Sequence, residues 1–277
     1  MEQKLYKFSG AGNDFVVIDG REGDVSSFRE VARIEALCRE FKTDGLMILG
    51  QEMLDQVGHD GVVVMADPDR PSVDFTMEFY NPDGSGGMMC GNGGRCIVAF
   101  ADYLGIRPAS GDVFLFRAPD GLHTGEILER PEDGLWEVRI KMIDVHGVTP
   151  MLGGLFLNTG TRHFVKFVDD VEQVDIDTEG KALRWDPAFA PVGTNVNFVH
   201  VAADGLHVRT FEKGVEGETL ACGTGLTASA IAAYYIGKPD TRLRARQDWL
   251  SVNFTPGPDE KFTDVYLTGP ARLVGIF

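Results

Sequence analysis

The chain contains an internal repeat of one unusual unit, a Cys-Gly-x-Gly turn that opens an apolar helix. The first unit covers residues 90–105 and the second covers residues 222–237. A strand signal precedes each unit at the same distance, because Phe79 to Cys90 and Phe211 to Cys222 are both 11 positions. A helix that is apolar on all sides must be buried. The sequence therefore predicts two similar halves, each built around a buried helix.

Short apolar runs flank both helices and predict strands. In the first half these runs cover residues 4–8, 15–19, 46–49, 61–66 and 72–80, and a helix is predicted over residues 28–41. In the second half, residues 164–169 echo 15–19 and residues 208–211 echo 75–79. Two units are too few for a solenoid. Because ligand sites commonly form between halves, a site is expected in the cleft that separates them.

The charge of the chain limits its partners. Lys plus Arg number 26 against 42 Asp plus Glu, a net charge of -16, which repels phosphate backbones and anionic lipid surfaces. Neither a nucleic acid nor a membrane partner is expected. The longest weakly polar stretch, residues 226–237, is far shorter than the roughly 20 residues of a membrane span, and residues 1–10 lack the apolar core of a signal peptide. A cytoplasmic location is expected.

The four cysteines are predicted to act as thiols. They are too few for a disulfide framework, and no pair has the Cys-x-x-Cys spacing of a zinc or redox site, so no metal is expected. Cys38 and Cys96 lie among apolar helix positions and are predicted to be packed core residues. Cys90 and Cys222 remain, each at a glycine-rich helix start.

A helix start suits both anion binding and thiol activation. Its unpaired backbone N–H groups and dipole favour a bound carboxylate, and they lower the pKa of a cysteine placed there. A nucleophilic mechanism needs one activated thiol and an orienting partner. Two equivalent thiols on opposite sides of a cleft suit inversion of a stereocentre, in which one takes the α-proton and the other returns a proton to the opposite face. Cys90 and Cys222 are predicted to be that pair.

Four segments resemble the diaminopimelate epimerase family. They are Gly-Ala-Gly-Asn-Asp-Phe at residues 10–15, Asn-Pro-Asp-Gly-Ser at 81–85, Met-Cys-Gly-Asn-Gly-Gly-Arg-Cys at 89–96, and Glu-Lys-Gly at 212–214 followed by Glu-Thr-Leu-Ala-Cys-Gly-Thr-Gly at 218–225. The resemblance runs in matching order from residue 4 to the C-terminus. It implies an isomerase, free of cofactor and metal, that interconverts LL- and meso-diaminopimelate in lysine and peptidoglycan biosynthesis.

The resemblance also implies a fold. It predicts a mixed α/β protein of two pseudo-symmetric domains, each a curled, barrel-like sheet around a buried central helix, with the active site in the cleft between them. Residues 1–141 with 268–277 would form the domain that carries Cys90, and residues 142–267 the domain that carries Cys222. The sequence leaves the oligomeric state open between a monomer and a homodimer.

Residue by residue, the resemblance makes Cys90 and Cys222 the proton-transfer groups and gives substrate contacts to eleven further positions. Backbone N–H groups at the two helix starts would hold the reacting carboxylate, two residues would line the reacting amino acid head, two asparagines would grip the distal end, and the rest would complete the site. The backbone donors are Gly91, Asn92, Gly223 and Thr224, and the residues at the amino acid head are Asn13 and Glu212. The distal asparagines are Asn81 and Asn195, and the remaining site residues are Thr161, His163 and Lys213.

This chain departs from the family pattern in three places. The usual Gly-Asn-Pro-His turn reads Gly-Thr-Arg-His at residues 160–163, the arginine that usually follows the glutamate is Lys213, and Gly45 stands at the place of a site glutamine. All three lie away from the two cysteines. The reaction type is therefore better determined by the sequence than the substrate is.

Three other functions compete with this interpretation. The nearest is a cofactor-independent racemase of the same architecture that acts on a proline-, hydroxyproline- or histidine-like substrate, for which the altered turn and Lys213 leave room. Isomerase or lyase relatives without the thiol pair are disfavoured by the presence of both cysteines. A non-catalytic protein with a Cys90–Cys222 disulfide is disfavoured by the expected reducing compartment.

Overall fold

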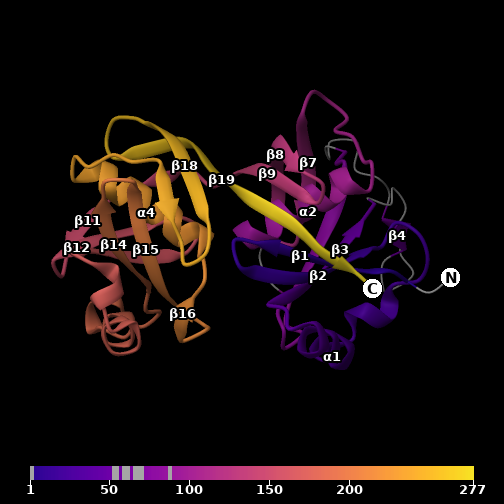
Figure 1. Cartoon of the computed structure of the whole chain (residues 1–277), viewed down its shortest axis with the longest axis horizontal. Helices are drawn as coiled ribbons and strands as arrows, with labels where there is room; N and C mark the ends of the chain where they lie inside the picture. The colour runs from indigo at the N-terminus through magenta and orange to yellow at the C-terminus, as the bar shows by residue number, and fades with distance from the viewer. Residues whose placement is uncertain (1–2, 52–55, 58–62, 65–71, 87–88) are drawn as a thin grey trace.

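The computed structural model describes residues 3–51, 56–57, 63–64, 72–86 and 89–277. It has two lobes, one around helix α2 (Gly91–Tyr103) and one around helix α4 (Gly223–Tyr235), and strand β19 (Lys261–Ile276) passes from the second lobe into the first (Figure 1). The C-terminus therefore lies in the lobe formed by the first half of the chain. Among the described residues, no helix is long and apolar enough to cross a membrane.

The two central helices confirm the repeat. Each has 13 residues and begins one position after its cysteine, with Cys90 and Cys222 as the N-cap residues. Residues 92–101 of α2 and 225–233 of α4 are buried, as their apolar composition requires. The remaining helical segments are short and peripheral: η1 (Ser26–Arg29), α1 (Val31–Phe41), η2 (Val171–Gln173), η3 (Ile176–Gly180), α3 (Lys181–Arg184) and η4 (Pro187–Phe189).

The first lobe is a closed sheet around α2. Its strands are β1 (Leu5–Gly10), β2 (Asn13–Asp19), β3 (Gly45–Gly50), β6 (Phe75–Tyr80), β7 (Val113–Ala118), β8 (Gly121–Glu132) and β9 (Leu135–Lys141). Each of these strands pairs with the next, and the C-terminal part of β19 pairs with both β9 and β1. The ring therefore has no free edge in this region, and α2 fills its interior.

The second lobe repeats the plan around α4. Its strands are β10 (Val145–His146), β11 (Thr149–Met151), β12 (Gly154–Asn158), β13 (Arg162–Phe167), β14 (Asn195–Ala202), β15 (Gly205–Glu212), β16 (Gly217–Thr219), β17 (Arg242–Arg244) and β18 (Trp249–Pro256). The order β12-β13-β14-β15-β17-β18-β19 has the same succession of parallel and antiparallel pairs as β1-β2-β3-β6-β7-β8-β9. The fold is the predicted pair of pseudo-symmetric α/β barrels.

Strand β19 joins the two barrels and closes the first. Its residues up to Thr268 pair with β18, and from Gly269 onward they pair with β9 and then β1. In the second barrel the corresponding closure is made by β10, which pairs with β19, and β11, which pairs with β12. One continuous sheet of 17 strands results among the described residues. This continuity ties the relative position of α2 and α4 to the backbone hydrogen bonds of β19.

The predicted elements differ from the structure mainly at their ends. The helix predicted over residues 28–41 begins as η1 and becomes α-helical at Val31, and the strand predicted over 72–80 begins at Phe75. The strand predicted over 61–66 lies mostly outside the described residues, of which Val63–Val64 form β5 and pair with β4 (Gln56–Val57). Cys38 is buried in an outer cluster between α1 and the sheet, as predicted.

Candidate active site

The starts of α2 and α4 meet backbone to backbone between the lobes. A Cβ atom on Gly91 would lie 3.8 Å from Gly223 Cα, and a Cβ atom on Gly223 would lie 3.6 Å from Gly91 Cα and 2.9 Å from Leu267 Cδ2. A side chain at position 223 would therefore require the Leu267 side chain of β19 to move. The sequence prediction that the two Cys-Gly-x-Gly turns come together from separate halves is confirmed.

Both turns leave backbone donors without an acceptor inside their helix. In α2 the first N–H group with a backbone acceptor in its own turn is that of Gly94, which donates to Cys90 O at 2.6 Å. In α4 it is that of Leu226, which donates to Cys222 O at 2.9 Å. The N–H groups before these positions find no acceptor inside the helix, and those of Asn92, Gly93 and Gly225 face the cysteine sulfur of their own turn. Two such termini that point at one place form a site for a carboxylate.

All four cysteines are free thiols, and Cys90 and Cys222 are close enough to influence each other's charge. Burial raises the pKa of the Cys90 thiol, although the backbone N–H groups of Gly93 and Asn92 act in the opposite direction. Burial also raises the pKa of the Cys222 thiol. The lowered thiol pKa values expected from the helix starts alone are wrong in net direction, because the cost of desolvating a thiolate exceeds the effect of the helix terminus.

Glu212 lies beside Cys222, at the end of β15. Burial raises the pKa of the Glu212 carboxyl, and the Thr219 hydroxyl and Cys222 thiol beside it act in the opposite direction. The carboxyl in turn raises the pKa of the Cys222 thiol, after burial itself. The predicted site glutamate is thus in contact with the second cysteine motif, and its charge favours a protonated Cys222.

Asn92 connects the two lobes through its side chain. Its Nδ2 donates to Asn13 Oδ1 at the start of β2 and to Ala221 O, 2.9 Å away in the second half. Its Oδ1 accepts from Arg95 Nη2 at 3.0 Å. The sequence assigned Asn92 a backbone contact, whereas the structure gives its buried side chain a bridging position between the cysteine motifs.

Thr224 is supported by a buried histidine. The His163 imidazole Nε2 lies 3.0 Å from Thr224 Oγ1 and 2.9 Å from Thr161 Oγ1, and Asn197 Nδ2 donates to Nδ1 at 2.9 Å. The proton of a neutral ring is therefore on Nε2. Burial lowers the pKa of His163 to about 3. His163 is fully buried, so it lies behind Thr161 and Thr224 in a supporting layer.

Asn195 begins β14 and has all its side-chain polar atoms engaged within the protein. Its Nδ2 donates to Arg162 O at 3.0 Å and to Thr161 Oγ1 at 3.4 Å, and its Oδ1 accepts from the Lys213 backbone N–H at 2.7 Å. Lys213 itself is exposed. The departures from the family pattern at Thr161 and Lys213 therefore lie together around Asn195. Thr161 Oγ1 also lies 3.2 Å from Thr224 Oγ1, which is 3.4 Å from Cys222 Sγ, so the expectation that this turn lies away from the cysteines was wrong.

Asn81 lies in the turn that follows β6. Its backbone N–H donates to Ser85 O at 2.9 Å and its Nδ2 donates to Ser85 Oγ at 3.0 Å. Gly45, the position of the missing glutamine, begins β3, where a Cβ atom would lie 2.7 Å from Tyr80 O. A side chain at position 45 therefore does not fit this backbone.

The sequence argument overlooked two buried polar residues that support the site. Asn197, which contacts His163, stands in a strand where an amide between apolar residues is a signal for a buried hydrogen bond. Arg95 is fully buried within the apolar run of α2. A single cation in an otherwise apolar helix was the signal that could have identified it.

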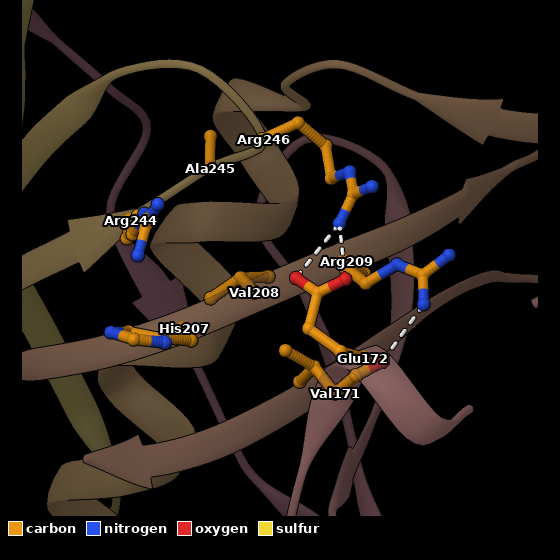
Figure 2. Close-up of a pocket in the computed structure, with 8 residues that line it drawn as sticks. All are labelled: Val171, Glu172, His207, Val208, Arg209, Arg244, Ala245 and Arg246. Atoms are coloured by element: carbon orange, nitrogen blue, oxygen red, sulfur yellow. Dashed lines mark hydrogen bonds and ion pairs between the residues drawn. The ribbon is translucent and has the colours of Figure 1, made fainter.

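A separate small pocket lies on the second lobe, and neither Cys90 nor Cys222 is among its lining residues. It has a volume of about 30 Å³ and is lined by Val171, Glu172, His207, Val208, Arg209, Arg244, Ala245 and Arg246 (Figure 2). Glu172 accepts two hydrogen bonds from Arg246 across it. Pockets for small-molecule substrates are about ten times larger. Among the described residues, no group of three or more His, Cys, Asp or Glu side chains is arranged to hold a metal ion.

Solved structures share this architecture. A phenazine biosynthesis protein of the PhzF family from Bacillus anthracis aligns with a TM-score of 0.69 at 11% identity, covering 100% of this chain and 99% of that one. A probable proline racemase from Agrobacterium radiobacter aligns with a TM-score of 0.62 at 16% identity, covering 100% and 92%. At these identities the alignments show a shared two-barrel fold.

Sequence comparison identifies the family. The family described as diaminopimelate epimerase matches residues 5–113 and 155–274. Diaminopimelate epimerases from Flavobacterium psychrophilum and Aquifex aeolicus are 37% and 39% identical to this chain; each alignment covers 98% of this chain, and they cover 98% and 95% of those proteins. The chain belongs to the diaminopimelate epimerase family. The resemblance inferred from the two cysteine motifs is confirmed.

Proposed function

We propose that this protein epimerises LL-diaminopimelate to meso-diaminopimelate by proton transfer between Cys90 and Cys222, without a cofactor. The observation that carries the proposal is the meeting of the two cysteine-capped helix starts at Gly91 and Gly223. One α-carbon held there has a thiol on each face. Inversion needs this arrangement, because the proton must leave one face and a proton must arrive at the other.

In the forward step, a thiolate on one cysteine removes the α-proton, and the electron pair of the broken C–H bond moves toward the substrate carboxylate. The backbone N–H groups of Gly91, Asn92, Gly223 and Thr224 stabilise the charge that develops there, as donors fixed before the reaction begins. The other cysteine then donates its thiol proton to the opposite face. The first cysteine ends as a thiol and the second as a thiolate, so the enzyme is ready for the reverse direction.

The remaining site residues have supporting roles in this proposal. Asn13 and Glu212 line the amino acid head, and Asn81, Asn195 and Lys213 lie toward the distal end. Thr161 and His163 hold Thr224, since both contact its hydroxyl. Lys213 supplies a positive charge for the distal carboxylate, although without the two-pronged donor geometry of arginine.

The domain division proposed from the sequence, residues 1–141 with 268–277 and residues 142–267, is supported by the change of partner strand between Thr268 and Gly269. We further propose a cytoplasmic location, supported by four free thiols and a net charge of -16. A homodimer stays a proposal to be tested by the mass of the protein in solution.

The decisive experiment is incubation of the protein with LL-diaminopimelate in deuterated water. We expect meso product that carries deuterium at the inverted α-carbon, while the unreacted LL substrate stays largely protiated at first. A Cys90→Ala, Cys222→Ala double variant is the matched control. Absence of inversion in the wild type would contradict the proposal, and faster turnover of proline or hydroxyproline in the same assay would favour the rival racemase function.

A further inference from the structure

Arg95 is an uncompensated positive charge in the core of the first lobe. Its side chain is fully buried, and among the described residues no carboxylate lies within ion-pair distance of its guanidinium. A buried charge without a paired ion is costly, so it is seldom kept for stability alone. Arginine also keeps its proton under all ordinary conditions. The charge of Arg95 must therefore act on the groups around it.

The guanidinium is fixed at the start of α2 by neutral acceptors. Arg95 Nη2 donates to Asn92 Oδ1 at 3.0 Å, Nη1 donates to Gly91 O at 3.4 Å, and Nε lies 3.5 Å from Pro270 O on β19. These contacts neutralise none of its charge. They hold it one and a half helical turns from Cys90, on the same helix and inside the same barrel.

The second half of the repeat has no such cation. An offset of 132 residues superposes Cys90 on Cys222 and Arg95 on Thr227, whose hydroxyl donates to Gly223 O at 3.0 Å. The Cys90 side thus has a guanidinium where the Cys222 side has a hydroxyl. Cys222 in addition has the Glu212 carboxyl beside it.

We propose that Arg95 is a positioning residue that gives the two thiols different resting states: its guanidinium keeps the negative charge on Cys90, and the proton stays on Cys222 beside Glu212. The inference rests on the proposed function, since it assigns the base of the first half-reaction. Arg95 acts through Cys90 and through Asn92, and it needs no contact with the substrate.

The surrounding charges support this assignment. After burial, which opposes it, the Cys90 thiolate is favoured first by the backbone N–H groups of Gly93 and Asn92 and then, against the opposing charge of Glu212, by Arg95. Glu212 disfavours a thiolate at both cysteines, and at Cys222 it is the strongest influence after burial, with no guanidinium to offset it. Several titratable or charged groups act on Cys90, Cys222 and Arg95. They are, besides these three, Cys96 of α2, Glu137 of β9, Glu212 of β15 and Asp248 before β18.

The test is alkylation of the substrate-free protein with iodoacetamide across pH 6 to 10, followed at Cys90 and Cys222 separately by peptide mass mapping. The midpoint of each curve of rate against pH gives the pKa of that thiol, and the plateau rate at high pH measures how accessible the sulfur is to the reagent. In the wild type we expect a lower midpoint for Cys90 than for Cys222. The reverse order would overturn the proposal without any variant.

Two neutral variants measure the contribution of Arg95. Arg95→Met and Arg95→Gln should lower the Cys90 alkylation rate at pH 7.5 about tenfold, because a buried cation nearby shifts a thiol by at least about one pKa unit. Arg95→Lys, which keeps the charge, should stay within about threefold of the wild type. Thr227→Val at the matched position should leave the Cys222 midpoint unchanged. Unchanged Cys90 midpoints in a folded neutral variant would refute the role of Arg95.

The labelling experiment requires no substrate, so it separates the two proposals. A wild type that does not invert diaminopimelate but shows the expected order of midpoints would contradict only the proposed function. A wild type that inverts diaminopimelate but has equal midpoints would contradict only the role of Arg95. A change confined to the high-pH plateau in the neutral variants would show that Arg95 has a purely structural effect, and it would also overturn the proposal.

Discussion

The two helix starts have the same backbone but different neighbours. In the first half, the Asn92 side chain donates to Ala221 O of the other half and accepts a hydrogen bond from Arg95. In the second half, Thr224 stays within its own lobe, where His163 and Thr161 contact its hydroxyl. The repeat thus preserves the thiols and the backbone donors, which the proposed function places on both faces of the substrate, while the side chains that contact these turns differ between the lobes.

The largest expected effect tests what the halves share. Cys90→Ala and Cys222→Ala should each lower kcat by at least roughly a hundredfold to ten-thousandfold, because each removes one of two proton-transfer groups. Cys38→Ala, in the outer cluster, is the matched control and should leave kcat unchanged. Steady-state kinetics in both directions provide the measurement. Substantial epimerisation by either active-site variant would show that only one half carries the chemistry.

The next prediction concerns the glycine three positions after each cysteine. A Cβ atom on Gly225 would overlap Asn197 Oδ1 and lie 3.3 Å from His163 Cε1, whereas one on Gly93 would meet the flexible Met47 Sδ at 3.2 Å. Gly225→Ala should lower the free energy of unfolding by about 2 kcal/mol through overpacking. Gly93→Ala should change it by less than about 1 kcal/mol, because alanine favours the helix. Urea unfolding of both variants measures the difference, and equal losses would contradict the different packing of the two starts.

His163 makes the second half sensitive to acid. Its folded pKa of about 3 lies below its unfolded value near 6.5, so the unfolded chain binds the proton first and stability falls as the pH drops below about 6.5. Between pH 7 and pH 5 this one group should reduce the free energy of unfolding by about 2 kcal/mol. Urea unfolding at the two pH values should show that loss in the wild type and a smaller one in His163→Gln. The same loss in both would show that His163 is not the titrating group.

The smallest expected effect lies at the proposed distal end of the substrate site. Because Lys213 is exposed, its interaction with a substrate carboxylate is worth about 1 kcal/mol or less. Lys213→Ala should therefore lower kcat/KM for diaminopimelate up to about fivefold, and Lys213→Arg should restore it. A monoamino acid without the distal carboxylate should show no loss. Equal losses on both substrates would remove Lys213 from distal recognition.

Sequence alone determined the features that depend on local chemistry and on the repeat. Each Cys-Gly-x-Gly motif is followed by an apolar run, and this pattern predicted two buried helices with cysteines at their N-termini, because a helix that is apolar on all sides is stable only in a core. The equal spacing of 11 residues from strand to cysteine indicated that both helices lie in similar strand-rich halves, and the family resemblance added the barrel-like shape of the sheets. The family motifs then indicated the reaction and most of the residues around the thiols.

Only the tertiary structure decided how the charges balance. Whether a helix start lowers or raises a thiol pKa depends on how much water the fold removes, and here burial exceeds the effect of the terminus at both cysteines. Sequence likewise could not show that the Asn92 side chain reaches Ala221, 129 positions away, or that Arg95 lies buried among neutral acceptors. These contacts arise where β19 brings two barrels together, and long-range pairing of that kind leaves no local pattern in the chain.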